Sequence, residues 1–144
     1  MRNPDQIIGD RYLLRWFLIP KNKWFNIYLH KFESSDDDRA LHDHPWWSVS
    51  FLLKGIISEV YYEDKELGKE FKDKKPKQQF AWRFIPFFRR ARYAHRVVLH
   101  SDCAWTLFIT GPKSREWGFY CPKGWIHWEL FCDETGDKRG PGCG

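Results

Sequence analysis

The chain has 144 residues, of which 42% are hydrophobic, 19% aromatic and 30% charged, and its formal net charge is +5 at pH 7. This length fits one domain of roughly 100 to 150 residues, and the supply of large apolar side chains excludes an intrinsically disordered chain. No run approaches the roughly 18 consecutive apolar residues of a membrane-spanning helix, and the first residues lack the basic-then-apolar layout of a secretory signal. We therefore expect a cytoplasmic protein that does not bind membranes.

Short runs of aromatic and β-branched residues, separated by Gly, Pro and charged residues, recur along the chain and are typical of antiparallel β-proteins. We predict strands at 12–19, 24–32, 48–54, 57–62, 79–85, 95–100, 105–110, 117–120 and 125–131. The charged stretch 63–77 is interpreted as a mobile connection, and the tail 134–144 has too few apolar residues to pack, so we expect it to be flexible. The pattern favours an all-β jelly-roll barrel formed by residues 1–133 as a single domain.

Two histidines, His42 and His44, are separated by one residue. Because side chains alternate between the faces of a strand, an HxH pair directs two imidazoles to the same side, about 7 Å apart along the backbone, while Asp43 faces away. This spacing suits metal binding, and a third ligand then has to come from elsewhere in the chain. We predict that His95 supplies it, near the start of a later strand. The competing histidines are His30, His100 and His127.

The run ALHDHPWWSVSFLLKG resembles the first conserved motif of the cupin family, in which HxH is followed by three or four residues, a Glu, six residues and a Gly. His42 and His44 match the HxH, Gly55 is the closing Gly, and Ser48 stands where the motif has Glu. RRARYAHRVVL resembles the second cupin motif only at the ligand position, His95.

The chain is also similar to small cupin-like proteins of phages and bacteria, which share runs like NIYLHKF, SDDDRALHDHPWW, AHRV and WTLFITGPKSREWGF. This resemblance implies a double-stranded β-helix, the cupin barrel, with a metal pocket formed by His42, His44 and His95. It implies the fold more strongly than a reaction, because cupin barrels support many unrelated chemistries.

Most metal-binding cupins use three histidines and one Glu, so Ser48 leaves a neutral ligand set around one divalent transition metal, which we expect to be iron, zinc, manganese or nickel. The full positive charge of that ion favours an anionic substrate. Among cupins, three-histidine sites include iron dioxygenases, whereas zinc held by three imidazoles supports hydrolysis. The sequence leaves the reaction class open between oxygenase, isomerase and hydrolase, and a dioxygenase-like enzyme is favoured. The alternatives are a cupin that binds a small molecule or nucleotide without turnover, and a degenerate cupin without metal.

Further site residues are predicted from the segments around the histidines. Arg96 and Glu116 are candidate catalytic residues, and the candidate substrate contacts are Arg92, Trp47, Ser48 and Trp105. Arginine side chains bind carboxylate or phosphate groups through paired hydrogen bonds, and neighbouring aromatic rings stack on planar groups. This combination predicts a small anionic, partly planar substrate. The competing interpretation is that the arginines are surface residues that aid solubility and that the tryptophans pack in the core.

Three further expectations concern partners and redox state. A net charge of +5 without a recognised nucleic-acid motif makes nucleic-acid binding a weak alternative. Exposed strand edges in such barrels favour a homodimer. The four cysteines show no CxxC spacing, so in the cytosol we expect free thiols at Cys103, Cys121, Cys132 and Cys143.

Overall fold

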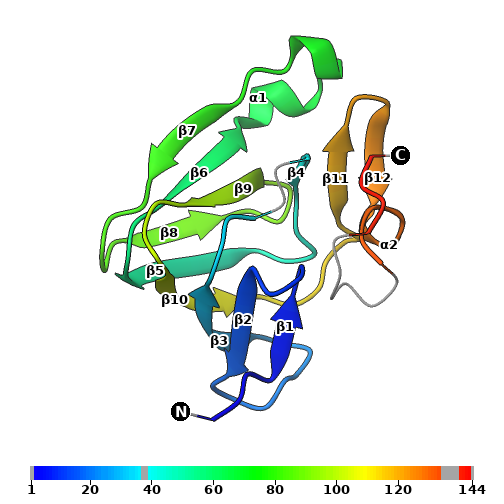
Figure 1. The fold of residues 1–144 in the computed structure, drawn as a ribbon. Coiled ribbons are helices and arrows are strands. Elements are labelled where there is room, and N and C mark those ends of the chain that lie inside the picture. The colour runs from blue at the N-terminus through cyan, green and yellow to red at the C-terminus, as the bar shows by residue number, and fades with distance from the viewer. Residues whose placement is uncertain (1, 37–38, 134–139, 144) are drawn as a thin grey trace.

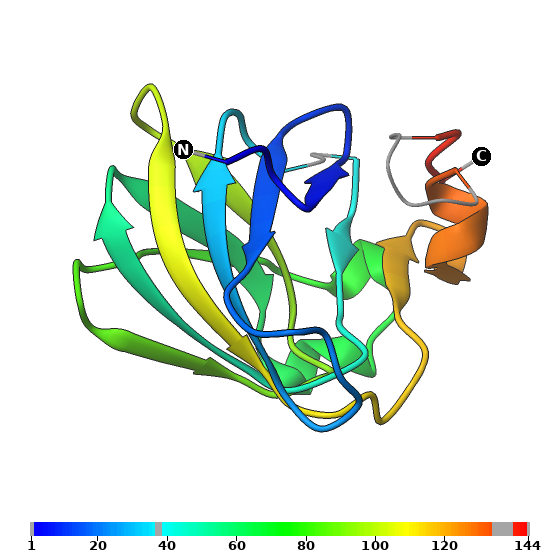
Figure 2. The same cartoon turned by 90° about the horizontal axis from the view of Figure 1, so that it is seen from below.

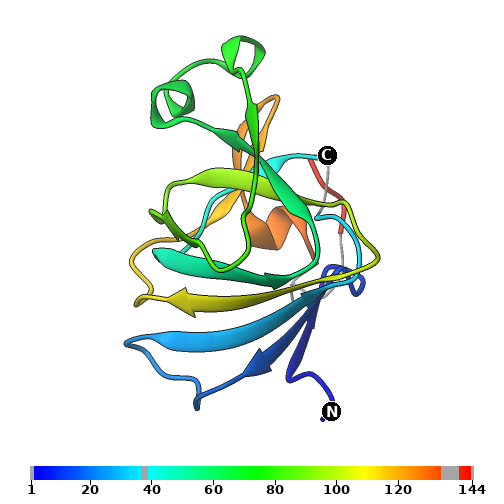
Figure 3. The same ribbon diagram turned by 90° about the vertical axis from the view of Figure 1, so that its left-hand side faces the viewer.

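The structure is a computed structural model that describes residues 2–36, 39–133 and 140–143. Two six-stranded antiparallel sheets form two layers (Figures 1 and 3). The first contains, in spatial order, β1 (Gln6–Ile8), β2 (Leu13–Phe17), β3 (Asn26–Phe32), β10 (Ala104–Thr110), β5 (Ser48–Lys54) and β8 (Pro86–Arg89). The second contains β12 (Gly124–His127), β11 (Gly118–Cys121), β4 (Leu41–His42), β9 (Ala94–Leu99), β6 (Ile57–Tyr62) and β7 (Lys77–Phe80).

From β3 to β11 every connection except that from β6 to β7 crosses between the sheets, so strands distant in sequence become neighbours (Figure 2). This winding confirms the predicted all-β jelly-roll class. The described strands form two separate sheets and not one closed barrel. No helix in the described part of the chain is long and apolar enough to cross a bilayer.

The space between the sheets is apolar at one end of the strands and polar at the other. The apolar cluster joins both sheets through Leu13, Phe32, Leu52, Ile57, Val97 and Ala104. Toward the opposite ends of the same strands the buried side chains are polar: Asn26, His30, Ser48, Glu59, His95, Thr106 and Thr110. Buried polar groups in such number need partners, and they place the functional site at this end of the interior.

Several predicted boundaries are wrong where turn residues interrupt the pattern. The predicted strand 79–85 ends at Phe80, because the chain turns through Phe84 at φ 63° before β8 begins at Pro86. The predicted strand 125–131 becomes β12 followed by α2 (Trp128–Phe131), where the His127 side chain accepts a hydrogen bond from the Glu129 backbone N–H. The charged stretch 63–77 contains α1 (Asp64–Leu67) and the 3₁₀ turn Phe71–Asp73.

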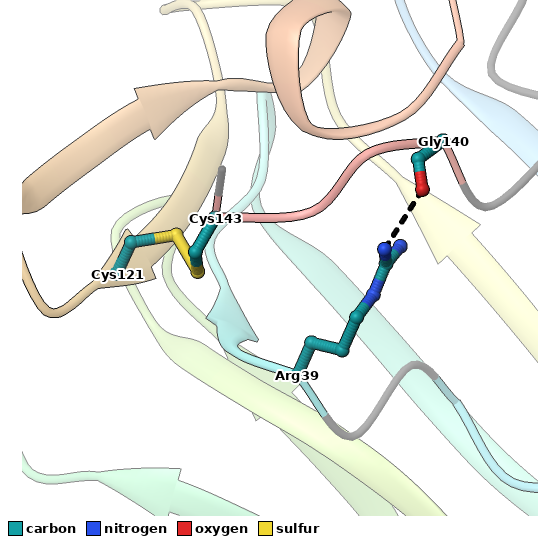
Figure 4. Close-up of a disulfide and its surroundings, with 4 residues drawn as sticks. All are labelled: Arg39, Cys121, Gly140 and Cys143. Atoms are coloured by element: carbon teal, nitrogen blue, oxygen red, sulfur yellow. Dashed lines mark hydrogen bonds between the residues drawn. A yellow bond between two sulfur atoms is a disulfide. The ribbon is translucent and has the colours of Figure 1, made fainter.

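The C-terminal residues return to β11 (Figure 4). Cys143 forms a disulfide with Cys121, Arg39 donates a hydrogen bond to the Gly140 carbonyl, and the Gly142 N–H donates to the Phe131 carbonyl. The predicted free thiols are therefore wrong for Cys121 and Cys143, because spacing along the sequence does not reveal that the tail folds back over β11. The predicted flexibility concerns mainly 134–139 and 144, which lie outside the described residues.

Replacing Cys143 by Ser is expected to lower the free energy of unfolding by about 3 kcal/mol. The disulfide spans a sequence separation of 22 residues, so its loss returns that loop's conformational entropy to the unfolded chain. Urea unfolding without reductant measures the difference from wild type, with Cys103→Ser, which lies outside the disulfide, as control. Equal midpoints for wild type and Cys143→Ser would show that the bond contributes nothing.

Candidate metal centre

Strand pairing brings the three predicted ligands together. His42 at the end of β4 lies directly opposite His95 of β9, and the His44 N–H donates to the Ala91 carbonyl just before that strand. One ligand atom from each histidine lies within 4.8 Å of the others. The ring centroids are 5.0, 4.9 and 4.8 Å apart, and Nε2 of His44 lies 3.1 Å from Nε2 of His95.

Two of these imidazoles form a hydrogen bond at Nδ1, and the third has a carboxylate near its Nδ1. His95 Nδ1 lies 2.6 Å from Oε1 of Glu59, His44 Nδ1 lies 3.2 Å from the Tyr93 carbonyl, and His42 Nδ1 lies 3.4 Å from Oδ2 of Asp36. An acceptor at Nδ1 holds the ring proton there and leaves the Nε2 lone pair available for a metal. Three rings oriented in this way form a ligand set.

Glu59 of β6 is the residue that the sequence reasoning missed. It is 2% exposed and accepts hydrogen bonds from Arg89 Nε at 2.8 Å and Tyr93 Oη at 3.1 Å, and it also forms a short contact with Arg89 Nη2. Burial alone would raise the pKa of Glu59, but Arg89 and His95 lower it to about 2. The signal in the sequence was a carboxylate on the inward face of a strand, two residues from Ile57.

The donor set fits a divalent transition metal. Burial, together with the neighbouring His95 and His42, lowers the pKa of His44 well below its usual value, which favours the neutral imidazole that binds metal. Ser48 is fully buried, and its hydroxyl has no hydrogen-bond partner among the described residues. Ser48 stands where the cupin motif has a Glu, so this position carries a neutral side chain. It lies opposite Arg89 in the β5–β8 ladder.

Aromatic rings surround the histidines. Trp46 stacks on His44 with centroids 5.5 Å apart, and Trp117 and Phe119 lie 6.0 and 5.6 Å from the His42 ring. Such a shell restricts water access and orients a planar ligand.

The other predicted site residues lie in different environments. Arg92 is exposed and ion-paired to Asp64, and Glu116 is exposed and ion-paired to Lys113 and His127. Arg96 alternates with His95 along β9 and faces the other side of the sheet.

The two predicted tryptophan contacts also lie apart from the metal ligands. Trp105 stacks on Trp16 on the outer face of its sheet, and Trp47 is exposed beside Phe88. Among the described residues, none of the six predicted catalytic or substrate contacts, Ser48 included, makes a hydrogen bond or ring contact with His44 or His95. Their roles stay predictions.

The competing histidines are engaged elsewhere. His100 Nε2 lies 2.8 Å from Ser58 Oγ, and His127 lies beside Glu116 at the start of α2. His30 accepts a hydrogen bond from Arg15 Nε. Burial, aided by the charge of Arg15, lowers the pKa of His30 well below its usual value.

This depressed pKa predicts a pH dependence of stability. Below about pH 6.5 the unfolded chain binds a proton at His30 that the native protein does not, so the free energy of unfolding falls by up to about 1.4 kcal/mol per pH unit as pH falls. His30→Gln lacks this contribution. Urea unfolding of wild type and His30→Gln, about one unit above and below pH 6.5, measures how the free energy of unfolding of each protein changes with pH. An identical change in the two proteins would contradict a neutral His30.

No family model and no curated protein matches this sequence. Solved structures match it by fold. Fe(II) HppE gives a TM-score of 0.52 at 13% identity over 69% of this chain and 50% of that chain. DMSP lyase DddQ from Ruegeria pomeroyi DSS-3 gives 0.54 at 13% identity, covering 79% and 54%. Peruvianin-I, a cysteine peptidase from Thevetia peruviana latex, gives 0.56 at 13% identity, covering 87% and 74%.

HppE and DddQ are cupin-fold proteins, and this chain resembles them in its two-sheet jelly roll. At 13% identity the likeness shows the fold alone, and the presence of a protein described as a cysteine peptidase among the matches illustrates why. The chain spans about half the length of HppE and DddQ. The case for metal binding therefore depends on the three histidines of this chain.

Proposed function

We propose that this protein is a cupin metalloenzyme that binds one divalent transition metal through His42, His44 and His95 and acts on a small anionic, partly planar molecule. The observation that carries the proposal is the convergence of three imidazoles whose ligand atoms lie within 4.8 Å of one another, with the Nδ1 atoms of His44 and His95 held by acceptors. A structural zinc site uses four protein ligands, whereas three leave positions for water and substrate.

The charge of the site supports an anionic substrate. All three ligands are histidines, which bind a metal ion as neutral imidazoles, and the carboxylate of Glu59 is ion-paired with Arg89. A divalent ion held there keeps its positive charge and supplies Lewis acidity to a bound ligand. Glu59 keeps His95 in one orientation, and Trp46 offers a flat surface beside His44.

The reaction class follows from the metal. Iron would support an oxygenase, the class favoured by the neutral three-histidine set, and one fold neighbour is named as Fe(II) HppE. Zinc would support hydrolysis. The second candidate function is binding without turnover, which the same pocket would serve.

Elemental analysis of protein purified without chelators tests the metal. We expect about one equivalent of a divalent transition metal per chain. Protein that contains none and takes up none from added Fe(II), Zn(II), Mn(II) or Ni(II) would refute the proposal.

A screen of small anions by thermal shift, followed by mass spectrometry of each stabilising compound, separates the two functions. An enzyme converts a stabilising compound only when metal is present. A binding protein returns the compound unchanged.

A further inference from the structure

Arg15 lies on the inward face of β2, outside the contacts of the metal centre. It pairs with His30 in the β2–β3 ladder, and its Nε donates to His30 Nε2 at 2.9 Å. Its Nη1 donates to Gln6 Oε1 at 3.2 Å, and its guanidinium carbon lies 4.3 Å from the Tyr28 ring centroid. Neutral groups therefore hold the guanidinium in place.

No carboxylate among the described residues forms an ion pair with Arg15. The other interior guanidiniums differ: Arg89 pairs with Glu59, and Arg115 pairs with Asp43. Burial lowers the pKa of Arg15, but a guanidinium remains protonated at neutral pH. Arg15 is half-buried, and a positive charge that is partly removed from water without a counter-charge is unfavourable, so this position suits an anion from outside the chain.

The pair also has donors to offer. Because His30 Nε2 accepts from Arg15, the ring proton lies on Nδ1. His30 Nδ1 and Arg15 Nη2 donate to no group among the described residues. Arg15 Nη2 therefore offers a charged N–H donor to an oxygen of a carboxylate or phosphate, while the hydrogen bond from Arg15 Nε to His30 Nε2 keeps the guanidinium in position.

A continuous series of rings links this pair to the metal centre. The His30 ring lies 4.8 Å from Phe108, Phe108 lies 5.5 Å from Trp46, and Trp46 lies 5.5 Å from His44. The strands that carry Arg15, His30 and Phe108 are neighbours in one sheet (Figure 1). A ligand with its anionic group at Arg15 would contact this series of rings, in which Phe108 and Trp46 meet edge to face at 68°.

We propose that Arg15 and His30 form the binding site for the carboxylate or phosphate group of a small anionic ligand, in place of the arginines beside His95. This inference deepens the proposed function, since it identifies the residues that hold the substrate's charge. The anion site itself needs no metal, so it is tested on metal-free protein.

Isothermal titration of the metal-stripped full chain with inorganic phosphate, and separately with acetate, tests the site. We expect wild type to bind at least one of the two anions, and the stronger of them identifies the anion type. Arg15→Met should weaken that binding by about tenfold or more, whereas Arg92→Met, which changes an exposed arginine, should leave it within about twofold.

His30→Phe provides a second variant that keeps Arg15 and a ring of similar size, in case Arg15→Met does not fold. It should weaken the same binding by about threefold to tenfold, because it removes the acceptor that holds the Arg15 guanidinium in position. Absence of binding to wild type, or unchanged binding by a folded variant of Arg15 or His30, would overturn the inference.

Metal content, measured on the same samples, separates this inference from the proposed function. Arg15→Met should retain the metal occupancy of wild type. If the protein binds metal but Arg15→Met binds the anion as tightly as wild type does, the anion site alone is refuted. A protein that binds no metal but binds phosphate or acetate through Arg15 refutes the metalloenzyme alone.

Discussion

His95→Ala is expected to reduce the bound metal from about one equivalent per chain to near zero. His95 is the ligand that faces His42 across the β4–β9 ladder, and its removal leaves two imidazoles from one short segment. Loss of a residue that only orients a ligand lowers metal affinity by about 10–100-fold, so loss of a ligand itself should exceed about a hundredfold. Elemental analysis after dialysis, and titration of the stripped protein with Zn(II) or Fe(II), measure the effect.

His127→Ala is the matched control. His127 is also a histidine with an acidic neighbour, but it lies at the start of α2 and contacts Glu116 and Trp128. Its substitution should leave the metal content unchanged. Full occupancy in His95→Ala, or equal losses in both variants, would contradict the assignment of His95 as a ligand.

Much of the fold was predictable because local alternation determines it. The predicted strands 48–54 and 57–62 coincide with β5 and β6, where β-branched and aromatic residues lie between clear turn signals. The short strands β1, β4 and β8 were missed, since two to four residues show too little periodicity. β4 and β8 are defined by pairing with strands distant in sequence, and β1 by its hairpin with β2.

Only part of the candidate site was predictable from the sequence. His42 and His44 follow from spacing, and Asp43, predicted to face away from them, bonds to the Gly118 N–H and Trp125 Nε1. Arg96 was chosen for its closeness to His95 in sequence, although adjacent strand residues face opposite sides.

Glu59 could not be placed from the sequence, because its contact with His95 depends on the pairing of β6 with β9. The same holds for Arg15, which belongs to a segment far from the histidine motifs and meets His30 only through the β2–β3 ladder. Residues that orient ligands or bind substrate from other strands are thus the part of the site that local patterns miss.

Glu59→Ala is expected to lower the free energy of unfolding by about 3–5 kcal/mol, a large fraction of the roughly 5–15 kcal/mol that stabilises a typical protein. The substitution leaves Arg89, which is 6% exposed, as a buried charge whose remaining hydrogen bonds go to Ser50 Oγ and the Phe87 carbonyl. Urea unfolding measures this. The double variant Glu59→Met/Arg89→Met removes both charges and should recover much of the loss, because a buried ion pair replaced by apolar side chains is often neutral in stability.

The milder variant Glu59→Gln separates stability from metal binding. Its amide can still accept from His95 Nδ1 but lacks the charge that strengthens this hydrogen bond, so metal affinity should fall about 10–100-fold. Glu66→Gln is the matched control, since Glu66 is also buried but bonds to Lys69 and to the Lys75 N–H beside α1. It should lower stability without changing metal affinity. If both variants bind metal as wild type does, Glu59 stabilises the interior through Arg89 alone and does not orient the ligand.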